Sequence, residues 1–327
     1  MAHRPSKTAA NTPESAAAAP QVRFLTVDGD MAERRLDNLL LSELKGVPRS
    51  KIYKIIRSGE VRVNKGRCKP SQRVSEGDVV RIPPVRLGEA KPQPDEASAG
   101  WINKYIIYKD ADVIALDKPA GLAVHGGSGI SAGAIELLRA ANPAEKSLEL
   151  VHRLDRDTSG CLLIARKRSS LRYLHEAFRE NAVQKTYLTM LEGRLAAGTQ
   201  DVKLPLEVRN RQNGERHVVV SDNGKAAHTR FIPLSPHREA TYTKVELFSG
   251  RTHQIRVHAQ ALGHPVLGDS RYGNKGCEAE RKLKVKRLFL HAAVLEYPDR
   301  RGEGTVLIEA PLDEQLSAIL NRLESGD

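Results

Sequence analysis

One short segment near the middle of the chain places carboxylates among guanidiniums. Residues 151–160 read VHRLDRDTSG, in which Asp155 and Asp157 stand beside two arginines, Arg153 and Arg156. Asp, Thr, Ser and Gly are turn formers, so a plain turn explains the end of the segment but not its Arg-Leu-Asp-Arg core. A neighbouring guanidinium favours the ionised form of a carboxyl group. An ionised carboxylate can serve as a nucleophile or as an ion-pair partner, whereas it is a poor general acid.

A second polar segment, SGRTHQIRVH at residues 249–258, contains two histidines and two arginines. His253 and His258 are five residues apart, which does not match the four-residue spacing of a helical zinc pair, so no metal site is expected. Arg251 follows a glycine at the expected start of a helix. In that position it is a natural partner for a carboxylate from elsewhere in the chain.

These segments need a scaffold, and residues 101–327 predict one that is built mainly from strands. Strand-like segments lie at 105–119, 149–167, 185–193, 216–221, 227–234, 240–248, 287–298 and 304–311, and helix-like segments at 131–142, 170–181 and 252–263. Strands outnumber helices and do not alternate with them regularly. The sequence therefore predicts an α+β fold with a mixed, largely antiparallel sheet, and not a doubly wound parallel sheet.

Residues 21–86 predict a separate small domain. Leucines and then isoleucines recur at helical spacing, which indicates two amphipathic helices, and short alternating strands follow. Residues 87–100 are rich in Pro, Glu, Ala and Ser, and we expect them to form a linker. Residues 1–20 are expected to be a disordered leader. The predicted order is thus leader, small domain, linker and a large domain at 101–327.

The net charge of the 327-residue chain is +12, from 52 Lys and Arg against 40 Asp and Glu. Half of it lies in residues 51–70, where seven cations face one acid. We call these seven residues the basic ridge: Lys51, Lys54, Arg57, Arg62, Lys65, Arg67 and Lys69. A positive ridge predicts contact with phosphates, and so a nucleic-acid partner. A second cluster from Arg281 to Arg287 is either a further phosphate contact or an exposed loop.

Composition excludes several other classes of protein. No apolar run approaches the roughly 18 residues of a membrane span, and the N-terminus lacks the apolar core of a signal peptide. The three cysteines, Cys68, Cys161 and Cys277, are odd in number and far apart, which argues against a disulfide framework and a CxxC zinc site. We therefore expect a reduced, cytoplasmic protein.

Four segments, in order along the chain, resemble the motifs of one enzyme family. HRLDRDTSG is similar to the catalytic motif of the RluA-type pseudouridine synthases, and LDKPAGLAVHGG, QKTYL and SGRTHQIRVHAQALGHPVLGD resemble their other motifs. Residues 34–67 resemble the S-four RNA-binding domain of ribosomal and RNA-modifying proteins. Together with the basic ridge, this combination is most similar to the family members that act on large-subunit ribosomal RNA.

The resemblance implies a role for each of four residues. Asp155 takes the place of the catalytic aspartate, and Arg153 that of the arginine which fills the stack after a base flips out. Tyr187 corresponds to the tyrosine that lies against the target uracil, and Arg251 to the arginine that pairs with the catalytic aspartate. The implied reaction is isomerisation of uridine to pseudouridine, without a cofactor. The implied partner is large-subunit ribosomal RNA, naked or within an assembling particle, and a monomer suffices.

Two other classes of function remain open from the residues. A non-catalytic RNA-binding or ribosome-assembly factor could keep the same fold. A glycoside-cleaving or metal-dependent hydrolase would need a second carboxyl group or a metal near Asp155. Two departures from the family pattern, Gly126 in the first motif and Ser249 in the third, remove no reactive group, so they bear on substrate choice more than on reaction type. Attack by Asp155 and proton abstraction by it also stay open.

Overall fold

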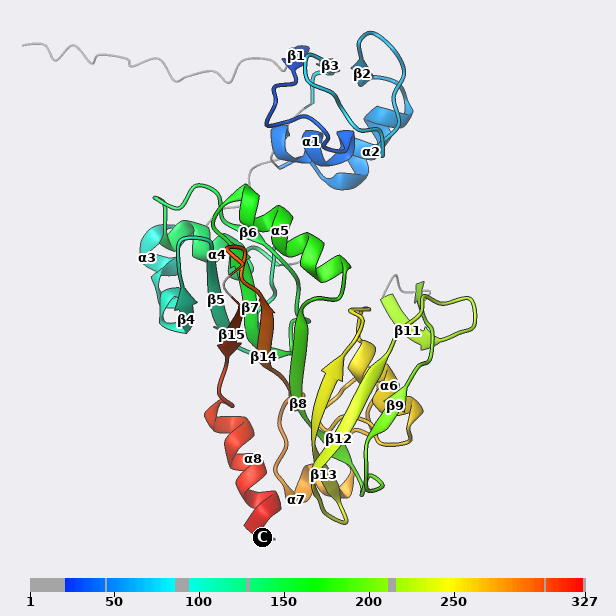
Figure 1. The fold of residues 1–327 in the computed structure, drawn as a ribbon. Helices are drawn as coiled ribbons and strands as arrows, with labels where there is room; N and C mark the ends of the chain where they lie inside the picture. Colours follow the sequence, from blue (N-terminus) through cyan, green and yellow to red (C-terminus); the bar gives the residue numbers. More distant parts are fainter. Residues whose placement is uncertain are drawn as a thin grey trace, which may run out of the picture. The chain divides into compact units, whose positions relative to one another are not determined.

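The structure is a computed structural model that describes residues 21–44, 46–85, 94–127, 130–210, 216–302 and 304–325. The described residues form two compact units that divide near residue 92, and each is treated by itself below. Figure 1 labels their helices and strands. The predicted leader at residues 1–20 lies outside the described residues.

The first unit is built from two helices and a small sheet. Its elements are β1 (Arg23–Thr26), α1 (Leu36–Glu43), α2 (Arg49–Arg57), β2 (Arg62–Val63) and β3 (Val79–Ile82). The strands pair antiparallel in the order β1-β3-β2. The leucines of α1 and the isoleucines of α2 that show helical spacing are buried in one core with residues of the sheet. The two predicted amphipathic helices therefore pack on their apolar faces.

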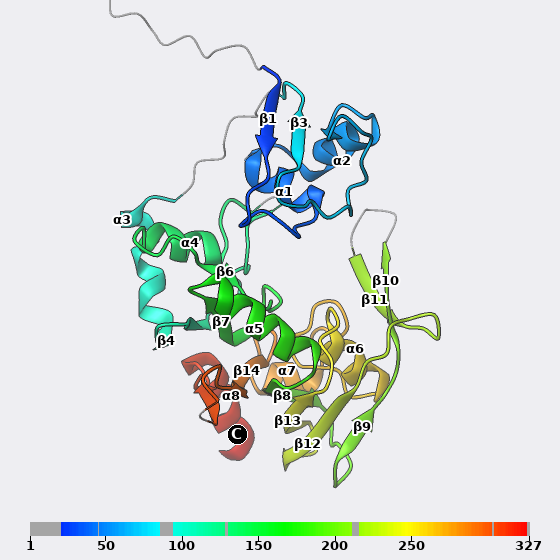
Figure 2. The ribbon, with the colours of Figure 1, turned by 45° about the horizontal axis from the view of Figure 1, so that its top comes forward.

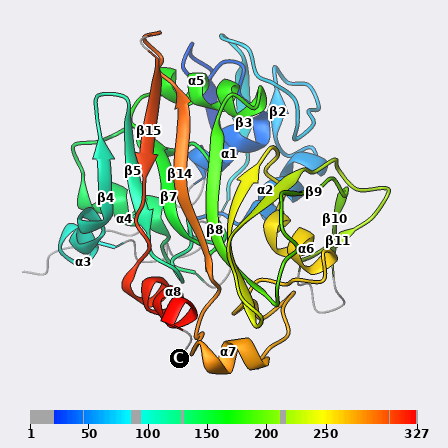
Figure 3. The same ribbon diagram turned by 60° about the horizontal axis from the view of Figure 1, so that its bottom comes forward.

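The second unit is organised around one large sheet. Its strands are β4 (Ile106–Lys109), β5 (Val113–Lys118), β6 (Glu149–Leu150), β7 (Ser159–Ala165), β8 (Gln184–Glu192), β9 (Gln200–Val202), β12 (Thr229–Pro236), β13 (Ala240–Leu247), β14 (Leu290–Pro298) and β15 (Thr305–Glu309). The main order is β4-β5-β7-β14-β8-β13-β12-β9, with β6 beside β7 and β15 beside β14. Figure 3 follows the strands from β4 to β8 across this sheet. Of the pairings between its described strands, β14 with β7 is parallel, which confirms the mixed, largely antiparallel α+β fold.

Helices cover both faces of the sheet. They are α3 (Glu96–Ala99), the 3-10 helix η1 (Gly100–Tyr105), α4 (Ala134–Ala141), α5 (Arg168–Arg179), α6 (Gln254–Ala261), α7 (Glu278–Lys282) and α8 (Glu314–Ser325). On β5, Ile114 and Leu116 pack with α4, whereas Val113 and Ala115 pack with α5 on the opposite face. The same alternation places α6 against one face of the β8 end of the sheet and α7 and α8 against the other.

A hairpin extends from this unit. Strands β10 (Leu206–Asn210) and β11 (Arg216–Val220) pair antiparallel with each other and project beyond the main sheet (Figure 2). Val208 and Val220 are exposed on it, whereas Leu206 and Val218 are buried against α6 and Tyr272. One residue of each strand, Leu206 and Val218, thus anchors the hairpin in the core.

The predicted linker at 87–100 is too long at its C-terminal end. Residues 96–105 form α3 and η1, and Ala99 and Ile102 are completely buried in the core beside α4. Small apolar residues in a polar stretch carry little periodicity, so the sequence pattern does not predict these helical turns. Helix α8 and strand β10 were also missing from the predicted elements. Residues 87–93 of the predicted linker lie outside the described residues.

One glycine explains part of the central motif. Gly160 has φ +106°, a conformation that favours glycine, and it lies where β7 pairs with β14. A Cβ at this position would collide with the backbone carbonyl of Ala292. The end of DTSG therefore serves strand packing, and this packing fixes where the loop that carries Asp155 meets the sheet.

Candidate active site

A pocket of about 120 Å³ opens between two loops of the second unit. One wall is the 153–158 loop between β6 and β7, and the other is the segment from Leu247 to Arg256 that leads into α6. Tyr187 of β8 and Leu290 of β14 line it from the sheet. The four residues singled out from the sequence, Arg153, Asp155, Tyr187 and Arg251, all line this pocket.

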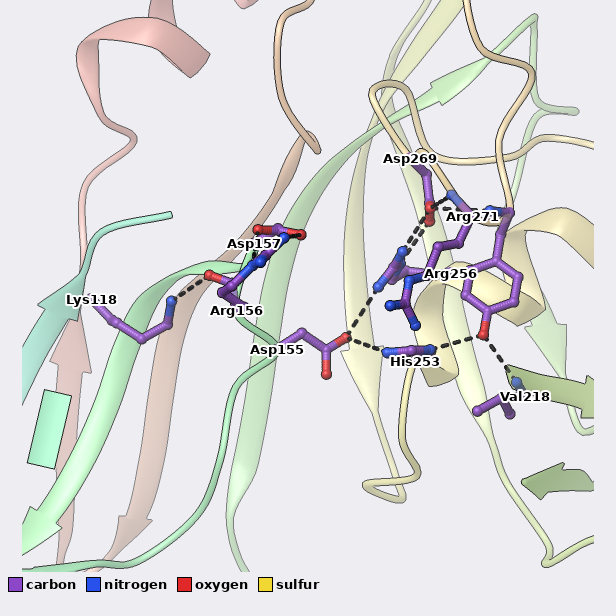
Figure 4. A network of polar contacts seen from close by, with 10 residues as sticks. Lys118, Asp155, Arg156, Asp157, Val218, His253, Arg256, Asp269 and Arg271 are labelled. Atoms are coloured by element: carbon purple, nitrogen blue, oxygen red, sulfur yellow. Dashed lines mark hydrogen bonds and ion pairs between the residues drawn. The ribbon is translucent and has the colours of Figure 1, made fainter. Parts of the chain in front are cut away.

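Asp155 faces two cationic or polar groups that project from the second wall (Figure 4). Its Oδ2 lies 3.5 Å from Nη1 of Arg256 and 3.8 Å from Nε2 of His253. The predicted partner was Arg251, but the Nε of Arg251 donates instead to the backbone carbonyl of Ala226, at 3.1 Å. The ion-pair prediction is therefore corrected from Arg251 to Arg256, because the turn before α6 directs Arg251 toward the mouth of the pocket.

Arg256 is itself held by a second carboxylate. Its Nε and Nη2 donate to Asp269 at 2.6 and 2.7 Å, a bidentate pair in which both side chains are buried. Burial opposes the charge of Arg256, but the hydrogen bonds to Asp269 and the negative charges of Asp269 and Asp155 together outweigh it and raise the pKa of the guanidinium. Burial likewise opposes the charge of Asp269, yet hydrogen bonds from Arg256 and from two backbone amides lower its pKa. A locked cation thus stands beside Asp155.

The loop that carries Asp155 is clamped from the side of β5. The buried Nζ of Lys118 donates to the carbonyls of Pro119, Leu122 and Arg156 at 2.8–3.0 Å. Gly121 N–H also donates to the Arg156 carbonyl, at 2.9 Å. Burial lowers the pKa of Lys118 to about 7, against the pull of Asp157 and Asp155, while three carbonyl acceptors favour the ammonium form. The LDKPAG segment therefore fixes the residue directly after Asp155.

Tyr187 presents its ring to the pocket from the sheet. Burial, together with the nearby charge of Asp155, raises the pKa of its hydroxyl well above the usual range, so the group stays protonated at neutral pH. Its side chain packs against the cores on both sides of the pocket. Arg153, in contrast, is exposed at the rim. The pocket thus joins a partly buried aromatic wall to an exposed cationic edge.

The two histidines of the third motif point to different partners. His258 is buried between Thr229 Oγ1 and the Leu204 carbonyl, at 2.8 and 2.9 Å. His253 lies instead between Asp155 and Tyr272. In the part of the chain that the structure describes, no three His, Cys, Asp or Glu side chains gather as a metal site would need.

The basic ridge lies in the first unit. Lys51, Lys54 and Arg57 are exposed on α2, on the side away from its buried isoleucines. Arg62 and Arg67 come together beside Gly59, directly after that helix. Lys65 and Lys69, in the turn and the segment that follow, are exposed as well. The ridge residues of the helix and of the following turn are therefore available to an anion.

Some cations of the second basic cluster, Arg281 to Arg287, form ion pairs within the protein. Lys282 of α7 pairs with Glu239 and Glu278, each at 2.9 Å. Arg287 is largely buried and pairs with Asp313. At least these two cations have structural partners. The alternative of an exposed loop is wrong for Arg281 and Lys282, because these two exposed residues lie in the helix α7.

Comparisons with known proteins show what the chain as a whole is similar to. A model of the RNA pseudouridylate synthase family matches residues 112–261, and an S4 domain model matches residues 34–80. Ribosomal large subunit pseudouridine synthase C of Escherichia coli (strain K12) is 47% identical over 316 residues, covering 94% of this chain and 98% of the relative. The protein of the same name from Haemophilus ducreyi is 47% identical over 308 residues, covering 93% and 96%. The chain belongs to the RNA pseudouridine synthase family and carries an N-terminal S4 domain, as the resemblance predicted.

A solved structure shares the fold. Human RNA Pseudouridylate Synthase Domain Containing 4 superposes with a TM-score of 0.59 at 24% identity, over 70% of this chain and 96% of that one. In addition, none of the helices among the described residues has the length and apolar character needed to cross a membrane.

Four side chains of the site were missed by reasoning from the sequence: Lys118, Arg256, Asp269 and Tyr272. Arg256 carried a usable signal, because it stands three residues after His253 in a predicted helix and so shares its face. Lys118 and Asp269 lie inside segments that resemble family motifs. Their roles depend on contacts with distant loops, which periodicity does not report.

Proposed function

We propose that the chain converts uridines of large-subunit ribosomal RNA to pseudouridine, with Asp155 as the catalytic residue. One observation carries the proposal: Asp155 shares a pocket with Tyr187 and is paired with a cation, Arg256, that is locked by Asp269. The family membership supports the reaction, and the names of the curated relatives support the substrate.

The reaction has three parts, and the pocket offers a group for each. The bond between N1 of uracil and C1′ of the ribose breaks, the base rotates, and a bond forms between C5 and C1′, while the C5 proton moves to N1. The uridine must first leave its stack, which costs a few kcal/mol. Stacking on Tyr187 offsets ~1–3 kcal/mol of this, and the exposed Arg153 fills the gap in the RNA.

Asp155 acts on the ribose side of the bond. Arg256 and His253 both lie on the side of Oδ2, so Oδ1 is the oxygen that these two residues leave to the substrate. Oδ1 can attack C1′ or remove a proton from the sugar, and both routes use the same charge on the same atom. Arg256 holds the carboxylate in place during either route. Arg251, at the mouth of the pocket, binds the RNA rather than Asp155.

The first unit supplies affinity. The exposed cations of the basic ridge match the regular charge of an RNA backbone, and such contacts fix position without reading sequence. The side chains that line the pocket all belong to the second unit, so we propose that a monomer suffices for the reaction. We also propose that the protein acts in the cytoplasm. The substrate is either naked RNA or RNA within an assembling particle.

The proposal is tested by mapping pseudouridines in ribosomal RNA from cells that lack the protein. We expect specific sites in large-subunit RNA to return to uridine, and to be restored by the unaltered chain but not by Asp155→Asn. The variant replaces one carboxylate oxygen with an amide of similar size, so it should still bind RNA. Binding without any dependence of pseudouridine on the chain would favour an RNA-binding factor. Strand or glycosidic cleavage products would favour a hydrolase.

A further inference from the structure

His253 has a backbone conformation that is uncommon for residues other than glycine, although histidine adopts it more often than most. It precedes α6 with φ 54° and ψ 20°, in the left-handed region. Residues with a Cβ avoid this region unless the surroundings hold them there, and such positions cluster at functional sites. The turn brings the imidazole between α6 and the Asp155 loop, where it is mostly buried.

The hydrogen bonds of His253 define which of its nitrogens carries the proton. Its Nδ1 lies 2.8 Å from the hydroxyl oxygen of Tyr272, and that oxygen also accepts the N–H of Val218, at 3.0 Å. Because the amide occupies the oxygen as a donor, the hydroxyl hydrogen of Tyr272 is directed to Nδ1. Nδ1 is then an acceptor, and the ring hydrogen is on Nε2, the nitrogen that lies 3.8 Å from Asp155 Oδ2 (Figure 4).

Tyr272 is held as firmly as the histidine. Its side chain is buried, its ring stacks on that of His217 with centroids 5.0 Å apart, and the Arg256 guanidinium lies 5.1 Å from the ring centroid. Val218, which donates its N–H to the hydroxyl oxygen, is the buried middle residue of β11. Two hydrogen bonds thus join the hairpin to Tyr272 and Tyr272 to His253, and a polar contact of 3.8 Å continues from His253 to Asp155.

Burial is the main reason why the pKa of the His253 imidazole is lowered and its neutral form favoured. Burial lowers its pKa, the negative charge of Asp155 and of Asp269 acts in the opposite direction, and Arg256 and Arg271 add to the lowering. A neutral donor can orient the Asp155 carboxylate without neutralising it. His253 and Arg256 both contact Oδ2 of Asp155. Together they would hold the carboxylate so that Oδ1 faces the substrate.

We propose that His253 is a positioning residue for the isomerisation: Tyr272, tied to the hairpin through Val218, fixes the imidazole so that its Nε2–H orients Asp155. The inference rests on the proposed function. It also means that the hairpin β10–β11 contributes to the geometry of the active site through the hydrogen bond between Val218 and Tyr272.

Two substitutions of one residue separate this role from a backbone role. In His253→Gln the side-chain amide can reach the position of Nε2, whereas in His253→Asn it is too short to do so. Asn, however, tolerates the left-handed conformation better than Gln. We expect kcat to fall by about tenfold or less in the Gln variant and about 100-fold in the Asn variant, the usual cost of a small misplacement. The KM for RNA should stay unchanged in both.

The opposite order, with Asn at least as active as Gln, overturns the proposal, because it is the order that backbone strain alone predicts. A matched control is His175→Gln, which changes an exposed histidine of α5 and should leave kcat unchanged. If the unaltered chain forms no pseudouridine, the proposed function itself fails. Activity in the unaltered chain with the wrong ranking of variants defeats only this inference.

A second experiment tests the link to Tyr272. Tyr272→Phe keeps the ring but removes the hydroxyl that joins Val218 to His253. We expect a loss of kcat of about tenfold in the single variant and no further loss when the substitution is added to His253→Asn, since coupled residues are not additive. Independent, multiplying losses would show that Tyr272 does not act through His253.

Discussion

The cations of the catalytic pocket and those of the basic ridge are the same residue types in opposite environments. The Arg256 side chain is 6% exposed and bound to Asp269, and Lys118 is completely buried among three carbonyls. Arg57 and its neighbours on α2 are exposed to water. The difference shows that a positively charged side chain can have two uses. When buried, it is a rigid part of a site, and when exposed, it adds to the electrostatic potential that attracts an anionic ligand.

Burial decides between these two uses. A charge in the interior is not screened, so it interacts strongly with its partner and leaves a large penalty when the partner is removed. An exposed charge is screened by salt within about 10 Å at 0.1 M, so it contributes little to stability and mainly attracts an anionic ligand. Substitutions in the two regions should therefore differ in size, in salt dependence and in what they affect.

The largest effect is expected from Arg256→Gln. It leaves Asp269 as a buried carboxylate without its bidentate partner, which should lower the free energy of unfolding by about 3–5 kcal/mol. It also removes the cation beside Asp155, so pseudouridine formation should fall by at least about 100-fold. Chemical denaturation followed by the fluorescence of Trp101, the one tryptophan of the chain, measures the first effect.

A double variant separates stability from catalysis at this pair. Arg256→Gln combined with Asp269→Asn removes both buried charges, so we expect part of the lost stability to return while activity stays low. Full activity in the double variant would mean that the cation beside Asp155 is dispensable. A single variant as stable as the unaltered chain would contradict the description of the pair as buried and mutually dependent.

Acid should next distinguish the two units. Burial lowers the pKa of His152 to about 4, and its Nε2 accepts the N–H of Leu163, at 3.0 Å, so the native ring is neutral. The unfolded chain binds a proton near pH 6.5 and the native one only near pH 4. Stability is therefore complete above pH 6.5 and falls as the pH drops toward 4, by up to about 3 kcal/mol from this one group.

The first unit should not share this loss. Residues 21–85 contain no histidine, and the hydrogen bond from Arg35 lowers the pKa of Asp37 to about 2, so that contribution is lost only below pH 4. Hydrogen exchange of α1 and α2, compared with Trp101 fluorescence between pH 4.5 and 7.5, follows the two units separately. His152→Gln should flatten the dependence seen by Trp101, with buried His258 and His291 accounting for the remainder. Equal acid sensitivity in both units would refute the comparison.

The smallest effect per residue is expected on the ridge. Replacing Arg57, Arg62 and Arg67 with Gln should weaken RNA binding and reduce the slope of log affinity against log salt by about one unit per lost contact at most. The free energy of unfolding and the kcat at saturating RNA should stay unchanged. Binding measured from 50 to 300 mM salt gives the slope.

The matched control removes three positive charges at other positions of the same unit. Arg23, Arg34 and Arg73 already contact Glu43, Ser42 and the Glu33 carbonyl, so their replacement by Gln should change the slope less. If both triple variants behave alike, only net charge matters and the ridge has no special position. An unchanged slope in the ridge variant would show that the ridge does not contact RNA.

Much of the fold followed from local patterns. The helices of the first unit, the strand-rich second unit and the loop around Asp155 were all predicted from spacing and turn chemistry. The failures have a common cause. For residues 96–105 and helix α8 it is packing against elements distant in the sequence, as the burial of Ala99 and Leu316 shows. Residues 96–105 carry weak periodicity of their own, whereas Leu316, Ile319 and Leu323 of α8 do recur at helical spacing.

The residue types of the site were determined by the sequence itself, since its motifs name an aspartate, an aromatic ring and nearby arginines whatever the fold around them. Tertiary structure decided which arginine pairs with Asp155. Arg251 and Arg256 are chemically equivalent and only five residues apart, so local sequence does not distinguish them. The choice depends on the left-handed turn at His253 and on Asp269, thirteen residues beyond Arg256, which holds one guanidinium in the pocket and leaves the other at its mouth.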